Sequence, residues 1–272
     1  KVNKLSKISK ILKKKIIEIS YLSKAHHIGS ELSCIDMMTV LYFYFLNINK
    51  QNLNKKNRDY FLLSKGHAAL ALYVTLMGKG FFSESYLKKN FLSNGGIFGG
   101  HPDYNAKKGI DSSSGSLGQC LSIGAGIALS LKKDHKSNKV VVMIGDGELN
   151  EGMIWEAIMF ASHHKLDNLL CVVDNNKLQG LGKSKNINNL EPIIDKINKF
   201  GWKTYSVNGH NIKEILTTLD KSNKNTKKPK MIIANSIKGY GVNFMENKLS
   251  SHYQVLDKEM YSKAIKDIEK NK

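Results

Sequence analysis

The stretch GDGELNEGMIWEAIMFASHHKLDNLLCVVDNNKL, residues 145–178, decides the fold. The apolar run before it, residues 140–144, has the length and β-branched composition of a buried strand that ends in a tight Gly-Asp-Gly turn. Residues 153–161 space apolar side chains three and four positions apart, which predicts a helix, and residues 169–173 form a second apolar run. A strand, a helix and a strand of these lengths predict a right-handed crossover between two parallel, adjacent strands.

This crossover brings Asp146 and Asn176, distant in sequence, to one edge of the predicted sheet. Ligands of open parallel sheets bind beyond the carboxyl ends of the strands, and glycines in such a turn let the backbone approach a phosphate closely. An Asp oxygen, an Asn oxygen, a backbone carbonyl and a diphosphate would form an oxygen-only shell that suits Mg²⁺ or Ca²⁺. From these residues alone, a metal-diphosphate site and a plain strand-to-helix turn both remain open.

The rest of the chain predicts one α/β domain rather than two small ones. A helix at residues 192–200, a strand at 202–207, a helix at 212–219 and a strand at 231–235 follow the crossover in alternation. This alternation predicts a parallel sheet with helices on both faces. The chain has 272 residues and only three prolines, and no run of Gly, Ser or Pro marks a domain boundary, so residues 1–272 are expected to form a single domain.

Composition favours a cytoplasmic protein. The three cysteines, Cys34, Cys120 and Cys171, lie in apolar contexts without CxxC spacing, which predicts small core residues in a reduced compartment. No apolar stretch is long enough to span a bilayer, and residues 1–15 lack the apolar centre of a signal peptide. Residues 4–21 form an amphipathic pattern that predicts a helix packed on its own domain rather than on a membrane.

The formal net charge of +19 raises nucleic-acid binding as a function class. The lysines are spread along the chain among many asparagines, and arginine is absent apart from Arg58. Nucleic-acid readout favours arginine and clustered patches, so a solvated lysine-rich surface is the favoured interpretation, with neither nucleic acid nor membrane as partner. Such a surface could still attract phosphorylated sugars or an acidic partner.

Four histidines lie in glycine-containing segments. His27 belongs to the predicted loop SKAHHIGSELS, residues 23–33, ahead of a helix at 34–46, and His67 follows a strand and a Ser-Lys-Gly turn within residues 59–73. His101 belongs to GGHPD, residues 99–103, and His252 ends SIKGYGVNFMENKLSSH, residues 236–252. Loops and helix amino termini are where α/β proteins place ligand-facing groups. His163 and His210 belong to none of these four segments and are predicted to lie on the surface.

Together these segments resemble transketolases over nearly the whole sequence. GDG followed about thirty residues later by NN matches the thiamine diphosphate fingerprint, and GGHPD is similar to the transketolase GHPE signature. SSSGSLGQ, residues 112–119, is similar to the family's TGPLGQG. The sequence also departs from the family pattern: Tyr253, directly after His252, and His26 each stand where the family has or more often has Gly, and the loop at 180–189 differs.

The resemblance implies a set of site residues. Mg²⁺ (or Ca²⁺) would be ligated by Asp146, Asn176 and the carbonyl of Leu178. The implied cofactor-binding residues are His67, Gly115, Leu117, Gly145, Asp146, Gly147, Glu148, Asn176, Ile237, Lys238 and His252. Gly147 would lie at the diphosphate, and Gly115 and Leu117 along the aminopyrimidine. The implied catalytic residues are His27, His67, His101, His252, Glu151 and Glu156, the two glutamates through cofactor activation across a subunit contact.

The resemblance also implies a split enzyme. A transketolase needs a pyrimidine-binding domain, for which the chain is too short. We therefore expect the N-terminal subunit of a transketolase that moves a two-carbon ketol unit from a ketose (phosphate) donor to an aldose-type acceptor. It would act only with a C-terminal subunit, which carries the pyrimidine-binding and C-terminal domains, in an α₂β₂ heterotetramer.

Several alternatives remain open. The acceptor could be a nucleotide-linked sugar or an oxo-sugar. The chain could also be a subunit of a 2-oxo acid dehydrogenase, which His101 in GGHPD argues against, or of a deoxyxylulose-phosphate-type synthase. Finally, it could be a nucleic-acid-binding or regulatory subunit that has kept the fold.

Overall fold

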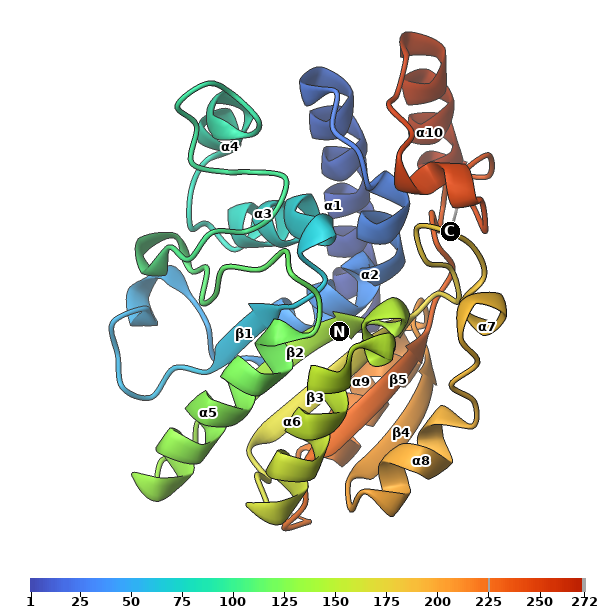
Figure 1. Ribbon diagram of the computed structural model, residues 1–272. Coiled ribbons are helices and arrows are strands. Elements are labelled where there is room, and N and C mark those ends of the chain that lie inside the picture. The colour runs from blue at the N-terminus through green and yellow to red at the C-terminus, as the bar shows by residue number, and fades with distance from the viewer. Residues whose placement is uncertain (225, 271–272) are drawn as a thin grey trace.

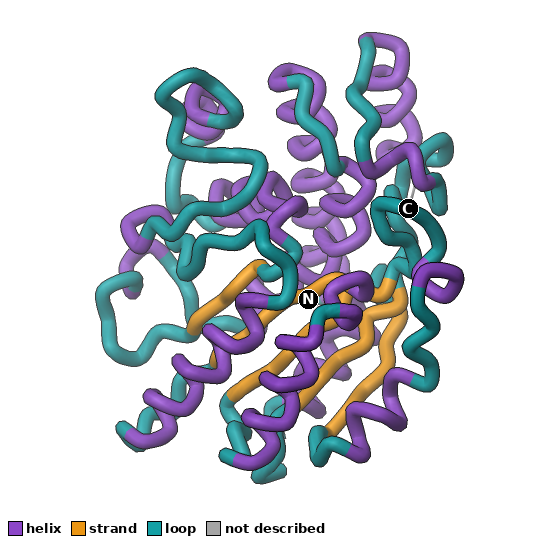
Figure 2. Tube along the Cα trace, viewed as in Figure 1, coloured by secondary structure: helices purple, strands orange, loops and turns teal. Residues whose placement is uncertain are grey.

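The computed structural model describes residues 1–224 and 226–270, which form a sheet between two layers of helices (Figure 1). Within these residues the sheet has five parallel strands in the order β1-β2-β3-β5-β4. The strands are β1 (Tyr60–Leu63), β2 (Val140–Gly145), β3 (Leu169–Asn175), β4 (Lys203–Asn208) and β5 (Lys230–Asn235). The predicted parallel sheet is therefore confirmed, and Figure 2 shows its strands side by side in the centre of the fold.

Ten α-helices lie around this sheet in the described residues, and one of them, α7, is a single turn within a connecting loop. They are α1 (Val2–Ser23), α2 (Ile28–Val40), α3 (Ala69–Gly78), α4 (Glu84–Asn90), α5 (Gln119–Lys133), α6 (Gly152–His163), α7 (Ser184–Ile187), α8 (Ile193–Lys199), α9 (Ile212–Ser222) and α10 (Lys258–Lys270).

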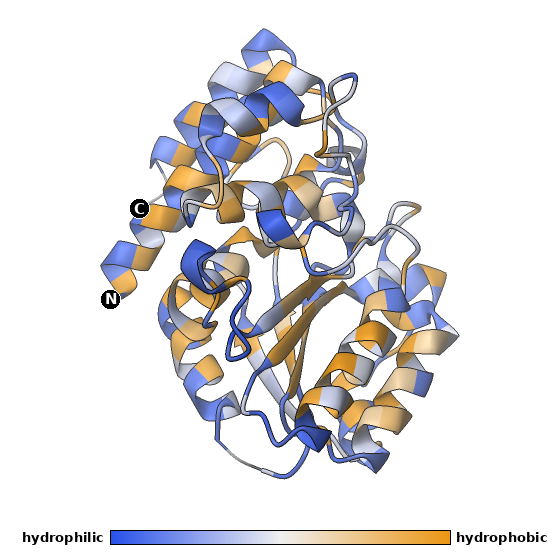
Figure 3. Cartoon of the chain, turned by 90° about the vertical axis from the view of Figure 1, so that its left-hand side faces the viewer, coloured by the Kyte–Doolittle hydropathy of each residue, from blue (hydrophilic) through white to orange (hydrophobic). Residues whose placement is uncertain are grey.

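Each face of the sheet has its own hydrophobic core, because successive side chains of a strand point to opposite faces. Val141 and Met143 of β2 pack with buried residues of α1, α2, α3, α9 and α10. Val140 and Val142 pack on the opposite side with buried residues of α5, α6 and α8. The strands β2 and β3 are buried along their whole length and are therefore mainly apolar, and Figure 3 shows hydrophobic strands between helices of mixed hydropathy.

The predicted crossover is present as β2, α6 and β3, with Gly145 in register with Asp174. The early helix differs from the prediction: α2 begins at Ile28, directly after His27, rather than at residue 34. The polar residues Ser30, Glu31 and Ser33 suggested a loop, but all three are buried inside the fold. The loop at 180–189 also contains one helical turn, α7.

All three cysteines are free and buried, as predicted. Across the residues that the structure describes, no helix combines the length and the apolar composition needed to cross a membrane.

Candidate active site

The predicted metal ligands follow two adjacent strands at the carboxyl edge of the sheet. Gly145 of β2 pairs in register with Asp174 of β3, so Asp146 and Asn176 leave neighbouring strands at the same edge. Asp146 opens a 3₁₀ turn, Asp146–Asn150, that connects β2 to α6. Asn176 is buried, and its Oδ1 accepts a hydrogen bond of 3.1 Å from the backbone N–H of Leu178. Carboxylate, amide and carbonyl oxygens of this kind are ligands for a hard divalent cation.

The electrostatics of Asp146 fit such a cation. Its carboxylate is buried and accepts a hydrogen bond of 2.5 Å from Ser184 Oγ. Burial, together with the charge of Asp174, raises the pKa of Asp146 to about 6, although Ser184, Lys65 and Lys238 act in the opposite direction. Burial disfavours the charged form of this carboxylate, and a bound divalent cation would stabilise that charged form.

Glu148 ties the Gly-Asp-Gly turn to two other loops. One carboxylate oxygen accepts hydrogen bonds from Ser64 Oγ at 2.6 Å and from the N–H of Gly118 at 2.9 Å, and the other accepts from the N–H of Gly145 at 2.8 Å. These three contacts join the loops after β1 and β2 to the start of α5. Glu148 therefore holds the turn in place, and its binding to a cofactor stays a prediction.

A cavity of about 1120 Å³ opens beside the predicted metal ligands. Its lining includes Asp146, Asn176 and Leu178 together with Gln179, Ser184, His210 and Ile237. A Cβ at Gly147 would lie 3.2 Å from Gln179 Cγ, so a side chain there would crowd the loop that borders this cavity. The cavity is large enough to admit a cofactor-sized ligand.

The other three motif histidines lie around His27. The ring centroid of His27 lies 5.0 Å from that of His252, 5.7 Å from that of His67 and 6.1 Å from that of His101. The rings of His67 and His252 lie 5.4 Å apart. Four segments that are far apart in sequence thus bring their histidines together, and the role of these histidines at a substrate stays a prediction. These four residues are not part of the cavity lining described above.

Three of these histidines are neutral near pH 7. Burial lowers the pKa of His27 to about 4, with a further contribution from His101. Burial and the charge of Lys238 lower the pKa of His252 to about 3, and burial holds the pKa of His67 well below its ordinary value. A neutral imidazole has one N–H donor and one acceptor nitrogen, so each ring can both give and take a hydrogen bond.

Lys238 orients one of these rings. Its Nζ lies 2.8 Å from Nδ1 of His252 and 3.4 Å from the carbonyl oxygen of Leu178. Burial and the nearby Lys65 lower the pKa of Lys238 to about 8, which leaves it mainly an ammonium group at pH 7. An ammonium can only donate, so Nδ1 of His252 accepts and the proton of the neutral ring sits on Nε2.

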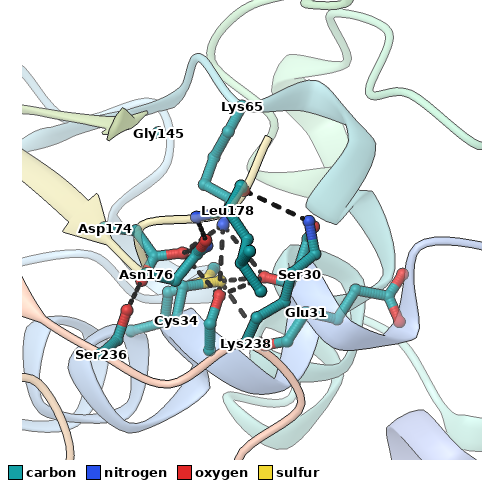
Figure 4. A network of polar contacts seen from close by, with 12 residues as sticks. Ser30, Glu31, Cys34, Lys65, Gly145, Asp174, Asn176, Leu178, Ser236 and Lys238 are labelled. Atoms are coloured by element: carbon teal, nitrogen blue, oxygen red, sulfur yellow. Dashed lines mark hydrogen bonds and ion pairs between the residues drawn. The ribbon is translucent and has the colours of Figure 1, made fainter. Parts of the chain in front are cut away.

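A buried ion pair that the sequence did not reveal lies beneath the site (Figure 4). The Asp174 carboxylate accepts hydrogen bonds from Lys65 Nζ, from Ser33 Oγ at 2.5 Å and from Ser236 Oγ. Lys65 also donates to the carbonyl of Ser30 at 3.0 Å. Asp174 thus joins α2, the turn after β1, the end of β3 and the segment after β5. Both charged residues stood inside quoted motifs, but nothing in those motifs showed that the two would meet.

The remaining predicted residues lie in the loop before α5 and at α6. A Cβ at Gly115 would lie 3.6 Å from the His101 ring, so this loop passes directly beside the histidines. Leu117 is 36% exposed in the turn that precedes α5. Glu151 and Glu156 are exposed, at the beginning of α6 and on its outer face. Their roles in binding and catalysis stay predictions.

The prediction for His210 is wrong, whereas His163 is exposed as expected. The His210 side chain is only 6% exposed because it lies between α2 and the segment after β5. Its Nδ1 is 2.8 Å from Asp36 Oδ2, and its Nε2 is 2.8 Å from the backbone nitrogen of Ile237. A polar NGHN turn is typical of a surface, and only its position after β4, at the carboxyl edge of the sheet, hinted otherwise.

Comparison with known proteins gives a consistent result. Residues 6–268 match the family model described as transketolase, thiamine diphosphate binding domain. A 6-deoxy-6-sulfo-D-fructose transketolase subunit from Clostridium sp. (strain MSTE9) is 41% identical over 244 residues, which cover 90% of this chain and 88% of that protein. An apulose-4-phosphate transketolase subunit from Phocaeicola vulgatus is 38% identical, with 94% of this chain and 90% of that protein covered.

Similarity also extends to much longer proteins. Human transketolase is 35% identical over 89% of this chain, but the match covers only 38% of the human protein. The crystal structure of transketolase from Campylobacter jejuni superposes with a TM-score of 0.91 at 29% identity, over 99% of this chain and 43% of that one. This chain therefore spans less than half the length of these transketolases and nearly the full length of the two subunits.

Proposed function

The chain belongs to the transketolase family through its thiamine diphosphate-binding domain, and we propose that it is the N-terminal subunit of a two-chain transketolase. In this proposal it transfers a two-carbon ketol unit from a ketose or ketose phosphate to an aldose-type acceptor. The observation that carries the proposal is the meeting of four histidines, His67, His101 and His252 around His27, each from a separate family motif.

The residues at the sheet edge would hold the cofactor. Asp146, Asn176 and the carbonyl of Leu178 would ligate Mg²⁺, and Gly147, Ile237 and Lys238 would lie beside the diphosphate. The raised pKa of Asp146 and the adjoining cavity support this assignment. Thiamine diphosphate, when bound, supplies the carbanion chemistry that breaks the C–C bond next to a ketose carbonyl.

The protein groups handle protons on the sugar. His27, His67, His101 and His252 would surround the donor sugar, where neutral imidazoles accept protons from hydroxyl groups and return them. His252 presents Nε2–H as a donor because Lys238 occupies its Nδ1. A hydroxyl oxygen that gains negative charge would be stabilised by this N–H.

We further propose that the outer face of α5 and α6 binds the second chain, in an α₂β₂ assembly. Exposed apolar side chains gather on and beside these two helices, including Leu117, Ile123, Met159 and Phe160. Exposed apolar side chains on neighbouring helices are a feature of protein interfaces. Glu151 and Glu156 are exposed at the start and on the outer side of α6, where they could reach a cofactor bound across the contact.

The two relatives that match over most of their length are each named as a subunit, which supports a second chain here as well. Their names also give sulfonated and phosphorylated sugars as substrates. We therefore propose that the sugar substrate has an anionic terminal group, and the lysine-rich surface would attract such a molecule.

The test is a ketol-transfer assay with a ketose phosphate donor, an aldose acceptor, Mg²⁺ and thiamine diphosphate. The chain is assayed alone and after mixing with its partner subunit, whose candidate is the product of the adjacent reading frame. We expect turnover only from the mixture. Full turnover by the purified chain would contradict the two-subunit proposal, and no transfer from the mixture would contradict the transketolase activity.

A further inference from the structure

His210 lies in the turn between β4 and α9, and both of its ring nitrogens make hydrogen bonds. The backbone N–H of Ile237 points at Nε2, 2.8 Å away, and a backbone N–H can only donate. Nε2 must therefore be unprotonated, so the ring proton sits on Nδ1. That proton is donated to Asp36 Oδ2, 2.8 Å away. The two neighbours together select one tautomer of a neutral imidazole.

Asp36 is held as an ionised acceptor. It lies on α2, and it also accepts hydrogen bonds from Ser9 Oγ and, at 2.8 Å, from Lys13 Nζ of α1. Although burial raises the pKa of Asp36, Lys13 and His210 together hold it below its ordinary value. The His210 ring also stacks on Tyr240, with ring centroids 3.5 Å apart and an angle of 15° between the planes. Both the plane and the tautomer of His210 are thus fixed by the fold.

The peptide that His210 holds is part of the site. Ile237 lies between Ser236, which donates to the buried Asp174, and Lys238, which donates to His252 and to the Leu178 carbonyl. A shift of Ile237 would therefore carry Lys238 away from Nδ1 of His252. The contacts run from Asp36 through His210 and Ile237 to Lys238 and the histidine cluster.

We propose that His210 is a positioning residue for this site. It holds the Ile237 peptide so that Lys238 can set the His252 tautomer. The proposal rests on the proposed function for its effect on turnover. The structural part of the proposal does not depend on any activity: His210 keeps its proton on Nδ1, and Lys238 is held in its position.

Two amide substitutions separate the two hydrogen bonds of His210. In His210→Gln the side-chain oxygen reaches the position of Nε2 and can accept from Ile237. In His210→Asn the shorter amide lies at the level of Nδ1, so it can donate to Asp36 but cannot reach Ile237. The two variants have similar polarity and differ in which of the two hydrogen bonds of His210 is kept. His135→Gln is the matched control, since His135 is exposed in the turn after α5.

The complex with the partner subunit, Mg²⁺ and thiamine diphosphate is assayed for ketol transfer. We expect kcat to fall about 10- to 100-fold in His210→Asn and to stay near the wild-type value in His210→Gln and in the control. Equal kcat values for the Asn and Gln variants, with both folded by thermal unfolding, would overturn the proposal.

Nitrogen NMR of the histidine rings gives a readout besides activity. Wild-type His210 should show the Nδ1–H tautomer, and His252 the Nε2–H tautomer. In His210→Asn the His252 signal should shift toward a mixture of tautomers, while His210→Gln leaves it unchanged. A wild-type His210 protonated at Nε2 would overturn the inference. If the wild-type complex lacks ketol transfer but these spectra are as expected, the proposed function fails and the inference on positioning stands.

Discussion

Lys238 Nζ lies 2.8 Å from Nδ1 of His252, and this hydrogen bond fixes how the imidazole faces the other histidines. Because the ammonium group occupies Nδ1, the proton on Nε2 is available to a ligand within the cluster around His27. A lysine in a basic chain would ordinarily be assigned to the surface. Here it is almost completely buried and acts through a second side chain.

Replacement of this lysine should therefore impair proton handling. In Lys238→Met the donor is lost, so His252 can place its proton on either nitrogen. We expect kcat of the reconstituted complex to fall on the order of 100-fold, the scale of one general acid–base contribution. Nitrogen NMR of His252 should show mixed tautomers. An unchanged tautomer together with unchanged kcat would contradict this role.

The histidine cluster should make the fold sensitive to acid. The pKa of His27 is about 4 and that of His252 about 3 in the folded chain, against an ordinary value of 6.5. As the pH falls from 6.5 toward 4, the unfolded chain binds protons that the folded chain excludes, so the free energy of unfolding decreases. Urea unfolding across this range measures the decrease.

Asp146 acts in the opposite direction over part of the same range, because its pKa is raised to about 6. The comparison is therefore made between the wild type and His27→Gln/His252→Gln, which both retain Asp146. We expect the double variant to lose less stability between pH 6.5 and 4. Identical pH profiles for the two proteins would contradict the lowered pKa values.

Replacement of only one member of the buried ion pair Lys65–Asp174 should lower the free energy of unfolding strongly. In Asp174→Asn the Lys65 ammonium keeps its charge without a carboxylate partner, and we expect a loss of about 3–5 kcal/mol in the free energy of unfolding. Lys65→Met/Asp174→Leu should lose less, because no charge is left buried. Urea unfolding provides the values.

The control is an exposed ion pair. Lys136 and Asp134 lie 2.8 Å apart with side chains 36% and 55% exposed, so Asp134→Asn should change stability by less than about 1 kcal/mol. An equally small effect at Asp174 would mean that Lys65 finds another partner or water.

Tyr253 should affect which sugars enter. It is 62% exposed, its ring centroid lies 4.5 Å from that of His252 and 5.9 Å from that of His27, and its hydroxyl lies 3.2 Å from where a Cβ at Gly180 would be. The phenol therefore covers the solvent side of the cluster. In Tyr253→Gly we expect KM for a long aldose phosphate to change about tenfold relative to KM for glycolaldehyde.

The comparison variant is Tyr253→Phe, which keeps the ring and should keep the wild-type ratio of the two KM values. If Tyr253→Gly gives the wild-type ratio as well, Tyr253 does not contribute to sugar selection.

The sequence predicted the parts of this molecule that depend on local pattern. The apolar runs before Asp146 and before Asp174 identified two adjacent parallel strands, because buried parallel strands are apolar on both faces. The four glycine-containing histidine segments identified the residues that meet around His27. The start of α2 was predicted too late because Glu31 and Ser33 read as solvent-exposed, whereas both lie within the buried network.

Contacts between polar residues that are far apart in sequence could not be predicted from local pattern. Lys65 and Asp174 are 109 positions apart and pair only because β1 and β3 flank β2. His210 and Asp36 are 174 positions apart and meet because α9 and α2 lie on the same face of the sheet. A single sequence gives no signal for such pairings, so the contacts of Asp174 and of His210 were missed, whereas the four histidines that lie together were identified.

The central claim is that Asp146 helps to hold a divalent cation and, through it, the diphosphate of the cofactor. Calorimetric titration of thiamine diphosphate into the reconstituted complex, with and without Mg²⁺, tests it for the wild type and for Asp146→Asn. We predict Mg²⁺-dependent binding by the wild type and its loss in Asp146→Asn, a variant close in size. Binding of equal affinity in both proteins, or wild-type binding that does not depend on Mg²⁺, would contradict the account.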